Sequence, residues 1–219
     1  METSAMQRGK FISFEGSEGC GKSTQIRRFV DWLRGTGREV LVTREPGGTA
    51  AGEKIRHLLQ HDSDGEGLTP ESELLLFAAS RAQLVREVIL PALDRGVWVV
   101  ADRFLDSTTI YQGVGRGLDR EAVQRINAFA VGAALPDLTF LLDLDAATGH
   151  ARAVAASGDQ HDRMESQPLA FFEKVRRGYL ELAAAEPSRI AVIDAGQGIE
   201  EVFDDLVRTF EARFTATTA

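Results

Sequence analysis

Residues 16–24 read GSEGCGKST and combine three glycines with a lysine and three hydroxyls. From Gly16 to Ser23 they fit the pattern G-x-x-x-x-G-K-[ST], between an apolar run and a helical one. Glycines let backbone N–H groups point at a phosphate, Lys22 can reach the outer phosphates, and Ser23 can offer oxygen to Mg²⁺. The pattern favours a triphosphate site over a ligand-free turn. The predicted ATP-binding residues are Gly16, Ser17, Glu18, Gly19, Cys20, Gly21, Lys22, Ser23 and Thr24.

A second group of candidate residues follows the apolar run VWVVADR, which leads directly into Asp102 and Arg103. In an open parallel sheet, ligands lie at the carboxyl ends of the strands. Asp102 could hold Mg²⁺ directly or through water, and Arg103 could bind a phosphate with its guanidinium fork. The alternative is a strand-end aspartate that caps the next turn. Beside a phosphate loop, we favour the functional interpretation.

Three more arginines stand in unusual surroundings. Arg44 lies in TREPGGT, Arg81 interrupts the apolar run LLLFAASRAQLV, and Arg116 lies in YQGVGRG, which we interpret as a glycine-rich loop. Each could be a surface charge on its own. Together, in an acidic chain, they indicate a second anionic substrate.

Five apolar runs alternate with longer segments of helical period, so we expect a five-stranded parallel sheet with helices on both faces. We also expect Pro91 to kink a helix over residues 71–94. The polar residues 157–167 are typical of a flap, so we expect a single domain over residues 1–219, with a mobile lid near 150–167. The predicted strands are residues 11–16, 39–46, 97–102, 138–145 and 190–196.

The composition of the 219 residues excludes several classes of protein. A net charge of −8 argues against binding to nucleic acid or a membrane surface. No run approaches the length of a membrane span, and the polar residues 1–10 lead us to expect no signal peptide. A single cysteine, Cys20, indicates a reducing compartment, which we take to be the cytoplasm. His57 and His61 are four residues apart, but Leu58 stands where a zinc protease needs glutamate.

The motifs together resemble the thymidylate kinase family over nearly the whole chain. The resemblance rests on FEGSEGCGKST, TREPGGT, LLLFAASRAQ, DRFLDSTTIYQGVGRG, and DRMES followed by FFEKVRRGYLELA. It implies a P-loop NTPase fold of the α/β class, usually as a homodimer. It also implies transfer of the γ-phosphate of MgATP to dTMP, which gives dTDP and ADP.

Carried over by position, the resemblance implies a pocket for thymine and its sugar. Phe77 would stack on the base and Arg81 would hydrogen-bond its edge. Ser107 and Gln112 would complete the pocket, and Tyr111 would crowd the 2′ position and favour deoxyribose. Phe77 and Tyr111 could equally be core aromatics.

The resemblance also implies how the phosphates are held. Arg44 and Arg103 would bind the phosphate of dTMP, and Glu18 would approach the sugar 3′-hydroxyl. Lys22 would act in catalysis with Arg103. The predicted Mg²⁺ ligands are Ser23, Asp102 and Glu165.

One feature departs from the family. Its members supply a catalytic arginine either from the phosphate loop, after the acidic residue, or from an arginine-rich lid. Here Gly19 follows Glu18, and residues 150–166 contain only Arg152 and Arg163. We expect Arg163 to deliver its guanidinium to the γ-phosphate, with Arg152 as the alternative.

Two other functions remain open at this point. A kinase for another nucleoside or nucleoside monophosphate is disfavoured, since a neutral nucleoside needs no arginine clamp. A P-loop ATPase switch is a protein of a different class. A GTP switch usually carries an N/T-K-x-D motif, which is absent from the sequence.

Overall fold

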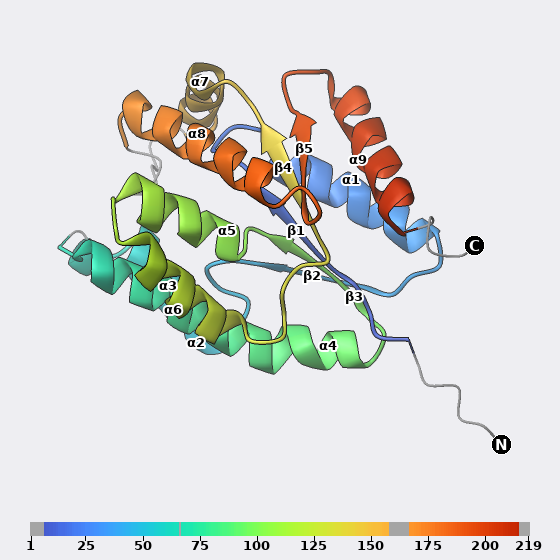
Figure 1. Cartoon of the computed structure of the whole chain (residues 1–219), viewed down its shortest axis with the longest axis horizontal. Coiled ribbons are helices and arrows are strands. Elements are labelled where there is room, and N and C mark those ends of the chain that lie inside the picture. Colours follow the sequence, from blue (N-terminus) through green and yellow to red (C-terminus); the bar gives the residue numbers. More distant parts are fainter. Residues whose placement is uncertain (1–6, 66, 158–166, 215–219) are drawn as a thin grey trace.

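Five parallel strands form the central sheet in the computed structural model, which describes residues 7–65, 67–157 and 167–214 (Figure 1). The strand order is β2-β3-β1-β4-β5, so the predicted parallel sheet is confirmed. The strands are β1 (Phe11–Glu15), β2 (Val40–Arg44), β3 (Trp98–Asp102), β4 (Leu138–Asp143) and β5 (Ile190–Asp194). The helical segments are α1 (Lys22–Gly35), α2 (Ala50–Gln60), η1 (Ser63–Gly65), α3 (Pro70–Leu84), η2 (Val85–Ile89), α4 (Leu90–Asp94), α5 (Leu105–Thr108), η3 (Thr109–Gly115), α6 (Arg120–Val131), α7 (Ala146–Ser157), α8 (Leu169–Ala185) and α9 (Ile199–Phe214).

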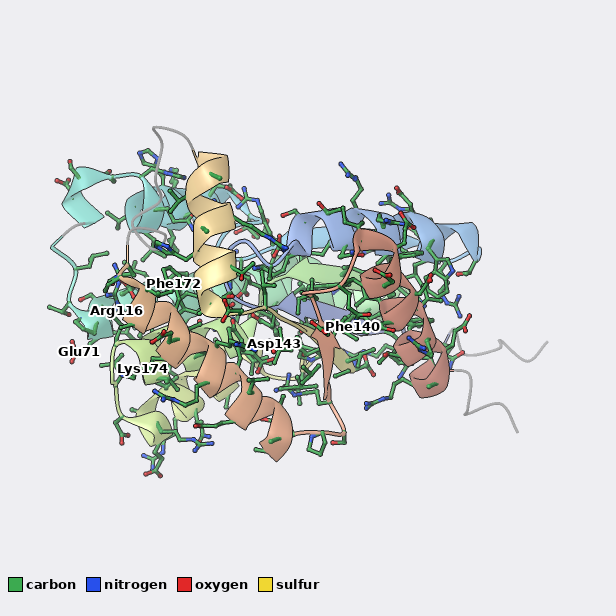
Figure 2. All side chains as sticks on the ribbon, turned by 90° about the horizontal axis from the view of Figure 1, so that it is seen from above. Glu71, Arg116, Phe140, Asp143, Phe172 and Lys174 are labelled. Carbon is green, nitrogen blue, oxygen red and sulfur yellow. The ribbon has the colours of Figure 1, made fainter. Side chains whose placement is uncertain are left out.

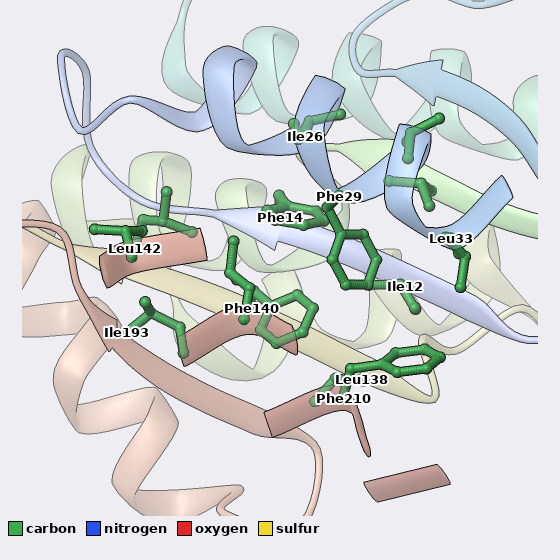
Figure 3. Packing of buried hydrophobic residues seen from close by; sticks show 14 of the residues in the cluster. Ile12, Phe14, Ile26, Phe29, Leu33, Leu138, Phe140, Leu142, Ile193 and Phe210 are labelled. Atoms are coloured by element: carbon green, nitrogen blue, oxygen red, sulfur yellow. The ribbon is translucent and has the colours of Figure 1, made fainter. Parts of the chain in front are cut away.

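Helices cover both faces of the sheet, as predicted. α1 and α9 pack on one face, and α4 and α8 pack on the other (Figure 1). The first interface is built around aromatic side chains: Phe29 of α1 lies with its ring centroid 5.4 Å from Phe140 and 5.6 Å from Phe210 (Figure 3). Because the central strands are buried on both faces, they are held rigidly. They therefore give the site a fixed base.

The two edge strands are not buried along their whole length. Along β2 and β5 buried and more exposed residues are interleaved, and Val42 and Val192 are exposed. Each edge strand has a neighbour on one side only, and the helices cover it incompletely. A continuous apolar run therefore does not predict full burial at an edge.

The helix expected over residues 71–94 is interrupted before Pro91, not at it. Residues 85–89 form a π-helical segment in which Leu90 N–H donates to the carbonyl of Val85, five residues back. Pro91 cannot donate a backbone hydrogen bond, and its ring would clash with the carbonyl four residues earlier. Widening the preceding turn relieves that conflict.

The interpretation of YQGVGRG as a loop was wrong, because residues 109–115 are also π-helical. The glycines permit close packing with α8. A Cβ at Gly115 would lie 2.7 Å from the ring of Phe171, and one at Gly178 would lie 3.2 Å from Val114. Arg116 therefore caps a helical segment that is pressed against α8.

Strand register brings the predicted functional segments to one edge of the sheet. Asp102 at the end of β3 pairs with Phe14 of β1 and with Arg44 of β2. The phosphate loop leaves β1 directly after Glu15. The carboxyl ends of β2, β3 and β1 therefore meet beside the phosphate loop.

Candidate active site

The phosphate loop has the backbone that its glycines predict. Gly16, Gly19 and Gly21 all have positive φ, and Gly21 caps the N-terminus of α1. Lys22 is buried, and its Nζ donates to the carbonyls of Gly16 and Ser17 at 3.0 and 2.9 Å. The lysine charge is thus held inside the loop, where a bound phosphate would compete with these carbonyls for it.

Helix α7 lies directly against this loop. A Cβ on Gly19 would stand 2.1 Å from the carbonyl oxygen of Gly149, and one on Gly149 would stand 2.7 Å from that of Glu18. Two glycines thus let the backbones of loop and helix touch. Arg152 is exposed on α7. It is three residues after Gly149, so it lies about one helical turn from this contact.

A cavity of about 180 Å³ opens beside the phosphate loop. All eight residues predicted to bind the second substrate line it, although they come from four separate stretches of the chain. The lining comprises Glu18, Arg44, Phe77, Arg81, Arg103, Ser107, Tyr111 and Gln112, together with Glu45, Pro46, Arg56, Gln60, Asp102 and Thr108. The sequence motifs therefore converge on one site.

Arg103 connects the cavity to the phosphate loop. Its φ of 67° is positive, a conformation that a non-glycine residue adopts at an energetic cost and that is common at functional sites. The guanidinium donates to Glu18 Oε1 at 2.6 Å and to Ser107 Oγ at 3.0 Å, and lies over the ring of Tyr111. The guanidinium of Arg103 is therefore fixed between the loop and the cavity.

Glu18 is ionised in this arrangement. Burial alone would raise the pKa of Glu18, but the charges of Arg103 and Lys22 outweigh burial and lower the pKa below its usual value. The Tyr111 hydroxyl donates to Glu18 Oε1 at 3.2 Å, and burial raises the pKa of this tyrosine. Tyr111 thus stays protonated as a donor, and Glu18 is a charged acceptor at the cavity wall.

Glu15 lies beneath the cavity and was not predicted as a site residue. Its Oε1 accepts the backbone N–H of Phe104 at 2.8 Å and, more weakly, that of Ser107 at 3.3 Å. Its Oε2 accepts the hydroxyls of Ser107 at 2.6 Å and Tyr179 at 2.8 Å. This fully buried carboxylate holds the start of α5, and with it Ser107, against the sheet.

Arg81 lines the cavity, but its side chain is almost fully engaged with protein atoms. Nε and one terminal nitrogen donate to Glu45 Oε2 at 2.8 and 2.6 Å. The same terminal nitrogen also donates to Thr108, and the other donates to Asn127. Since a guanidinium has five N–H groups, one N–H of the second nitrogen is left for a base edge. Arg81 can therefore act only as a precisely oriented donor.

Two cations gather at the turn after β2. Arg44 donates to the carbonyl of Pro46 at 3.0 Å and to Glu53 at 2.9 Å, and Arg56 of α2 donates to the same carbonyl at 3.1 Å. Arg44 and Arg56 thus converge on one point of the cavity wall. Arg56 and Gln60 both line the cavity. Their spacing of four residues places them on one face of α2, which is the signal in the sequence that could have indicated Arg56.

Arg116 does not line the cavity, although we had grouped it with the substrate arginines. It donates to Glu73 at 3.3 Å through Nε and to Gln167 at 3.2 Å. Its guanidinium also lies over the ring of Phe171. The charge of Arg116 thus serves contacts between α3, η3 and the start of α8.

Several predicted residues lie outside the cavity or outside the described part of the chain. Ser23 is exposed at the start of α1, next to Lys22. Arg163, Glu165 and most of the polar part of the lid lie outside the described residues, so their roles stay predictions. Among the described residues, no three His, Cys, Asp or Glu side chains gather to hold a metal ion. No helix in the described part is long and apolar enough to cross a bilayer.

Comparison with known proteins gives a consistent result. The family model for thymidylate kinase matches residues 14–206. A thymidylate kinase of Geobacter sulfurreducens is 51% identical over 196 residues, which cover 88% of this chain and 92% of that protein. One of Chlorobium luteolum is 47% identical over 213 residues, which cover 93% and 97%.

A solved structure agrees with these sequences. The crystal structure of thymidylate kinase from Ehrlichia chaffeensis superimposes with a TM-score of 0.74 at 33% identity, and covers 93% of this chain and 99% of that one. That neighbour has the P-loop NTPase fold, and the phosphate loop and sheet described above conform to it. By sequence and by structure, the chain belongs to the thymidylate kinase family.

Proposed function

We propose that this protein transfers the γ-phosphate of ATP to the 5′-phosphate of dTMP. The observation that carries the proposal is the cavity beside the phosphate loop, where four arginines, Phe77 and Glu18 converge. Such a concentration of cations in an acidic chain favours an anionic ligand. A phosphorylated nucleoside supplies both the charge and a flat base for Phe77.

The phosphate loop supports the assignment of ATP as donor. Its backbone N–H groups and the N-terminus of α1 favour negative charge, and Lys22 can move from the loop carbonyls to the outer phosphates. Ser23 and Asp102 fit Mg²⁺, which takes one or two hard oxygen ligands from protein and keeps several waters. When bound, the ion would neutralise phosphate charge between donor and acceptor.

The acceptor needs alignment more than activation, because its phosphate oxygen is already nucleophilic. Arg44 pairs with Asp102 in the register of β2 and β3, and Arg103 follows Asp102 in the chain. Both arginines line the cavity and can fork onto the phosphate. Arg103 can do so while it keeps its bond to Glu18, because the terminal nitrogen that donates to Ser107 has a second N–H for the ligand. Positioning of this kind supplies much of the catalysis in phosphoryl transfer.

Arg163 or Arg152 is proposed to stabilise the charge of the transition state. Arg152 is supported by its place on α7, one turn beyond the contact with the phosphate loop. Replacing an arginine in this role costs about 10³–10⁵ in rate in other enzymes, and partial redundancy could reduce that to about 100-fold. Steady-state kinetics of Arg163→Ala, Arg163→Lys and Arg152→Ala identifies the residue. If all three keep kcat within a few-fold of the parent, another group meets the charge.

We also propose that the protein is a homodimer through α3 and α6. These helices pack side by side, and Leu75 on α3 and Phe129 on α6 are 55% and 81% exposed. Large apolar side chains on adjacent helices are typical of an interface. Sedimentation of the parent and Phe129→Glu tests this: a dimer should become a monomer. A parent that sediments as a monomer at micromolar concentration would contradict the proposal.

The experiment that tests the proposed reaction is a coupled ADP-release assay. ATP should be consumed only when a nucleoside monophosphate is added, with dTMP the best acceptor. ADP release without an acceptor would favour an ATPase switch. Faster release with thymidine than with dTMP would favour a nucleoside kinase, and equal kcat/KM for dTMP and dCMP would contradict the base assignment.

A further inference from the structure

Gln112 is the one amide among the described residues that is held in the cavity wall by a carboxylate. It lies on η3, is 1% exposed, and lines the cavity beside Arg81. Its Nε2 donates to Glu73 Oε1 at 2.8 Å. Within the described part of the chain, its Oε1 accepts no hydrogen bond. The carbonyl side of the amide is therefore left for a ligand.

Glu73 stands in the first turn of α3 and is also 1% exposed. Besides Gln112 it receives Arg116, whose Nε and terminal nitrogen lie 3.3 and 3.4 Å away. A carboxylate paired with a guanidinium presents only acceptor oxygens. The amide nitrogen of Gln112 must therefore face Glu73, and the amide oxygen of Gln112 must face away. The contact with Glu73 thus fixes the orientation of the amide.

The two groups that read a base in this cavity consequently have opposite character. Arg81 offers one N–H as a donor, because Glu45, Thr108 and Asn127 occupy the others. Gln112 offers a carbonyl as an acceptor. Thymine presents O4 as an acceptor beside N3–H as a donor, which complements this pair. Cytosine presents an amino donor beside N3 as an acceptor, which opposes both groups.

We propose that Glu73 is a positioning residue that sets the base preference by fixing the orientation of the Gln112 amide. This inference rests on the proposed function, since it concerns how the acceptor base is chosen. While Glu73 Oε1 accepts from the amide nitrogen, the amide can only accept from N3–H. Without the charge of Glu73 the amide can turn over and donate to N3 of cytosine.

The test is Glu73→Gln, which keeps the shape but offers both a donor and an acceptor to Gln112. The ratio of kcat/KM for dTMP to that for dCMP should fall by about 10-fold. The fall should come from a lower kcat/KM for dTMP, caused mainly by a higher KM. The matched control is Glu71→Gln. Glu71 lies in the same first turn and points outward (Figure 2), so its change removes an equal charge from the helix N-terminus without touching Gln112.

A second pair of variants separates positioning from general damage. In a Gln112→Met background, Glu73→Gln should leave the dTMP/dCMP ratio unchanged, because the amide through which it acts is gone. A purely structural role would lower both substrates alike in either background. If Glu73→Gln does not fold, Glu73→Asp replaces it. Its shortened carboxylate withdraws from Gln112, and the ratio should again fall.

A ratio for folded Glu73→Gln within two-fold of the Glu71→Gln control overturns the inference. So does an equal fall of the ratio in the Gln112→Met background. These outcomes are separate from failure of the proposed function. A parent enzyme that does not phosphorylate dTMP refutes the function, whereas a selective parent with an unaltered Glu73→Gln variant refutes only the role of Glu73.

Discussion

The buried carboxyl of Glu15 makes the stability of this protein depend on pH. Burial and the neighbouring charge of Asp106 raise the pKa of Glu15 from 4.5 to about 7, while Arg103 and the hydrogen bonds from Ser107 and Phe104 oppose the rise. A carboxyl with a raised pKa in the folded state favours folding when protonated. Its contribution is complete below about pH 4.5 and is lost as the pH rises through about 7.

The perturbation is Glu15→Gln, which removes the charge and can keep the contacts. The amide oxygen can accept the N–H groups of Phe104 and Ser107, and the amide nitrogen can donate to the hydroxyls of Ser107 and Tyr179, which rotate to accept. Between pH 5 and pH 8 the parent should lose about 2.5 kcal/mol of unfolding free energy relative to the variant. For a chain of this length, the Tm of the parent should fall by about 5–10 °C relative to the Tm of Glu15→Gln over the same pH interval.

Urea denaturation of both proteins from pH 5 to pH 8.5 measures this difference directly. The control is Glu181→Gln on α8, an exposed position on the helix that carries Tyr179, where the two curves should stay parallel. If parent and Glu15→Gln also stay parallel, Glu15 does not titrate in this range. If the parent gains stability relative to the variant as the pH rises, the argument has the wrong sign.

The remaining predictions concern the active site. Lys22→Ala should lower kcat by at least about 10²–10³ with an unchanged Tm, as measured by ADP release, and near-parental turnover would contradict the phosphate-loop assignment. The enzyme should use dUMP less well than dTMP but not exclude it, since one methyl is worth only about 1–3 kcal/mol in kcat/KM. Gly149→Val should weaken ATP binding, because its side chain would press on the carbonyl of Glu18, 2.7 Å from the new Cβ. Calorimetry measures that loss, and parental affinity would show that α7 can move away freely.

The sequence predicted the sheet and the cavity because both depend on local pattern. Apolar strands, helical periods and a glycine-rich loop each occupy a few neighbouring residues. In a parallel sheet the carboxyl ends of the strands lie at one edge, where ligands bind. That is why Arg44 and Asp102 lie beside one cavity as expected, whereas Phe77 on α3 was expected there only from the resemblance to thymidylate kinases. The π-helical segments were missed, since a widened turn has no composition of its own and is determined by packing against α8 and by Pro91.

The acids beneath the site were missed for a different reason. Glu15 looks like the end of a strand, Glu45 like part of a turn, and Glu73 like an acid placed to complement a helix N-terminus. Each of these local interpretations is chemically sound. What distinguishes the three residues is a partner 36 or more positions away, and no local pattern reports such a partner.

The arginines nevertheless imply these acids. A guanidinium in a buried wall is stable only when paired, so arginines that are predicted to line an enclosed cavity require buried acceptors around them. Arg81 has Glu45, and Arg103 has Glu18. The pairing leaves each arginine with few N–H groups for a ligand. A site built this way recognises its ligand by the orientation of donors as much as by charge, which is why removing a buried acid should change selectivity before it abolishes binding.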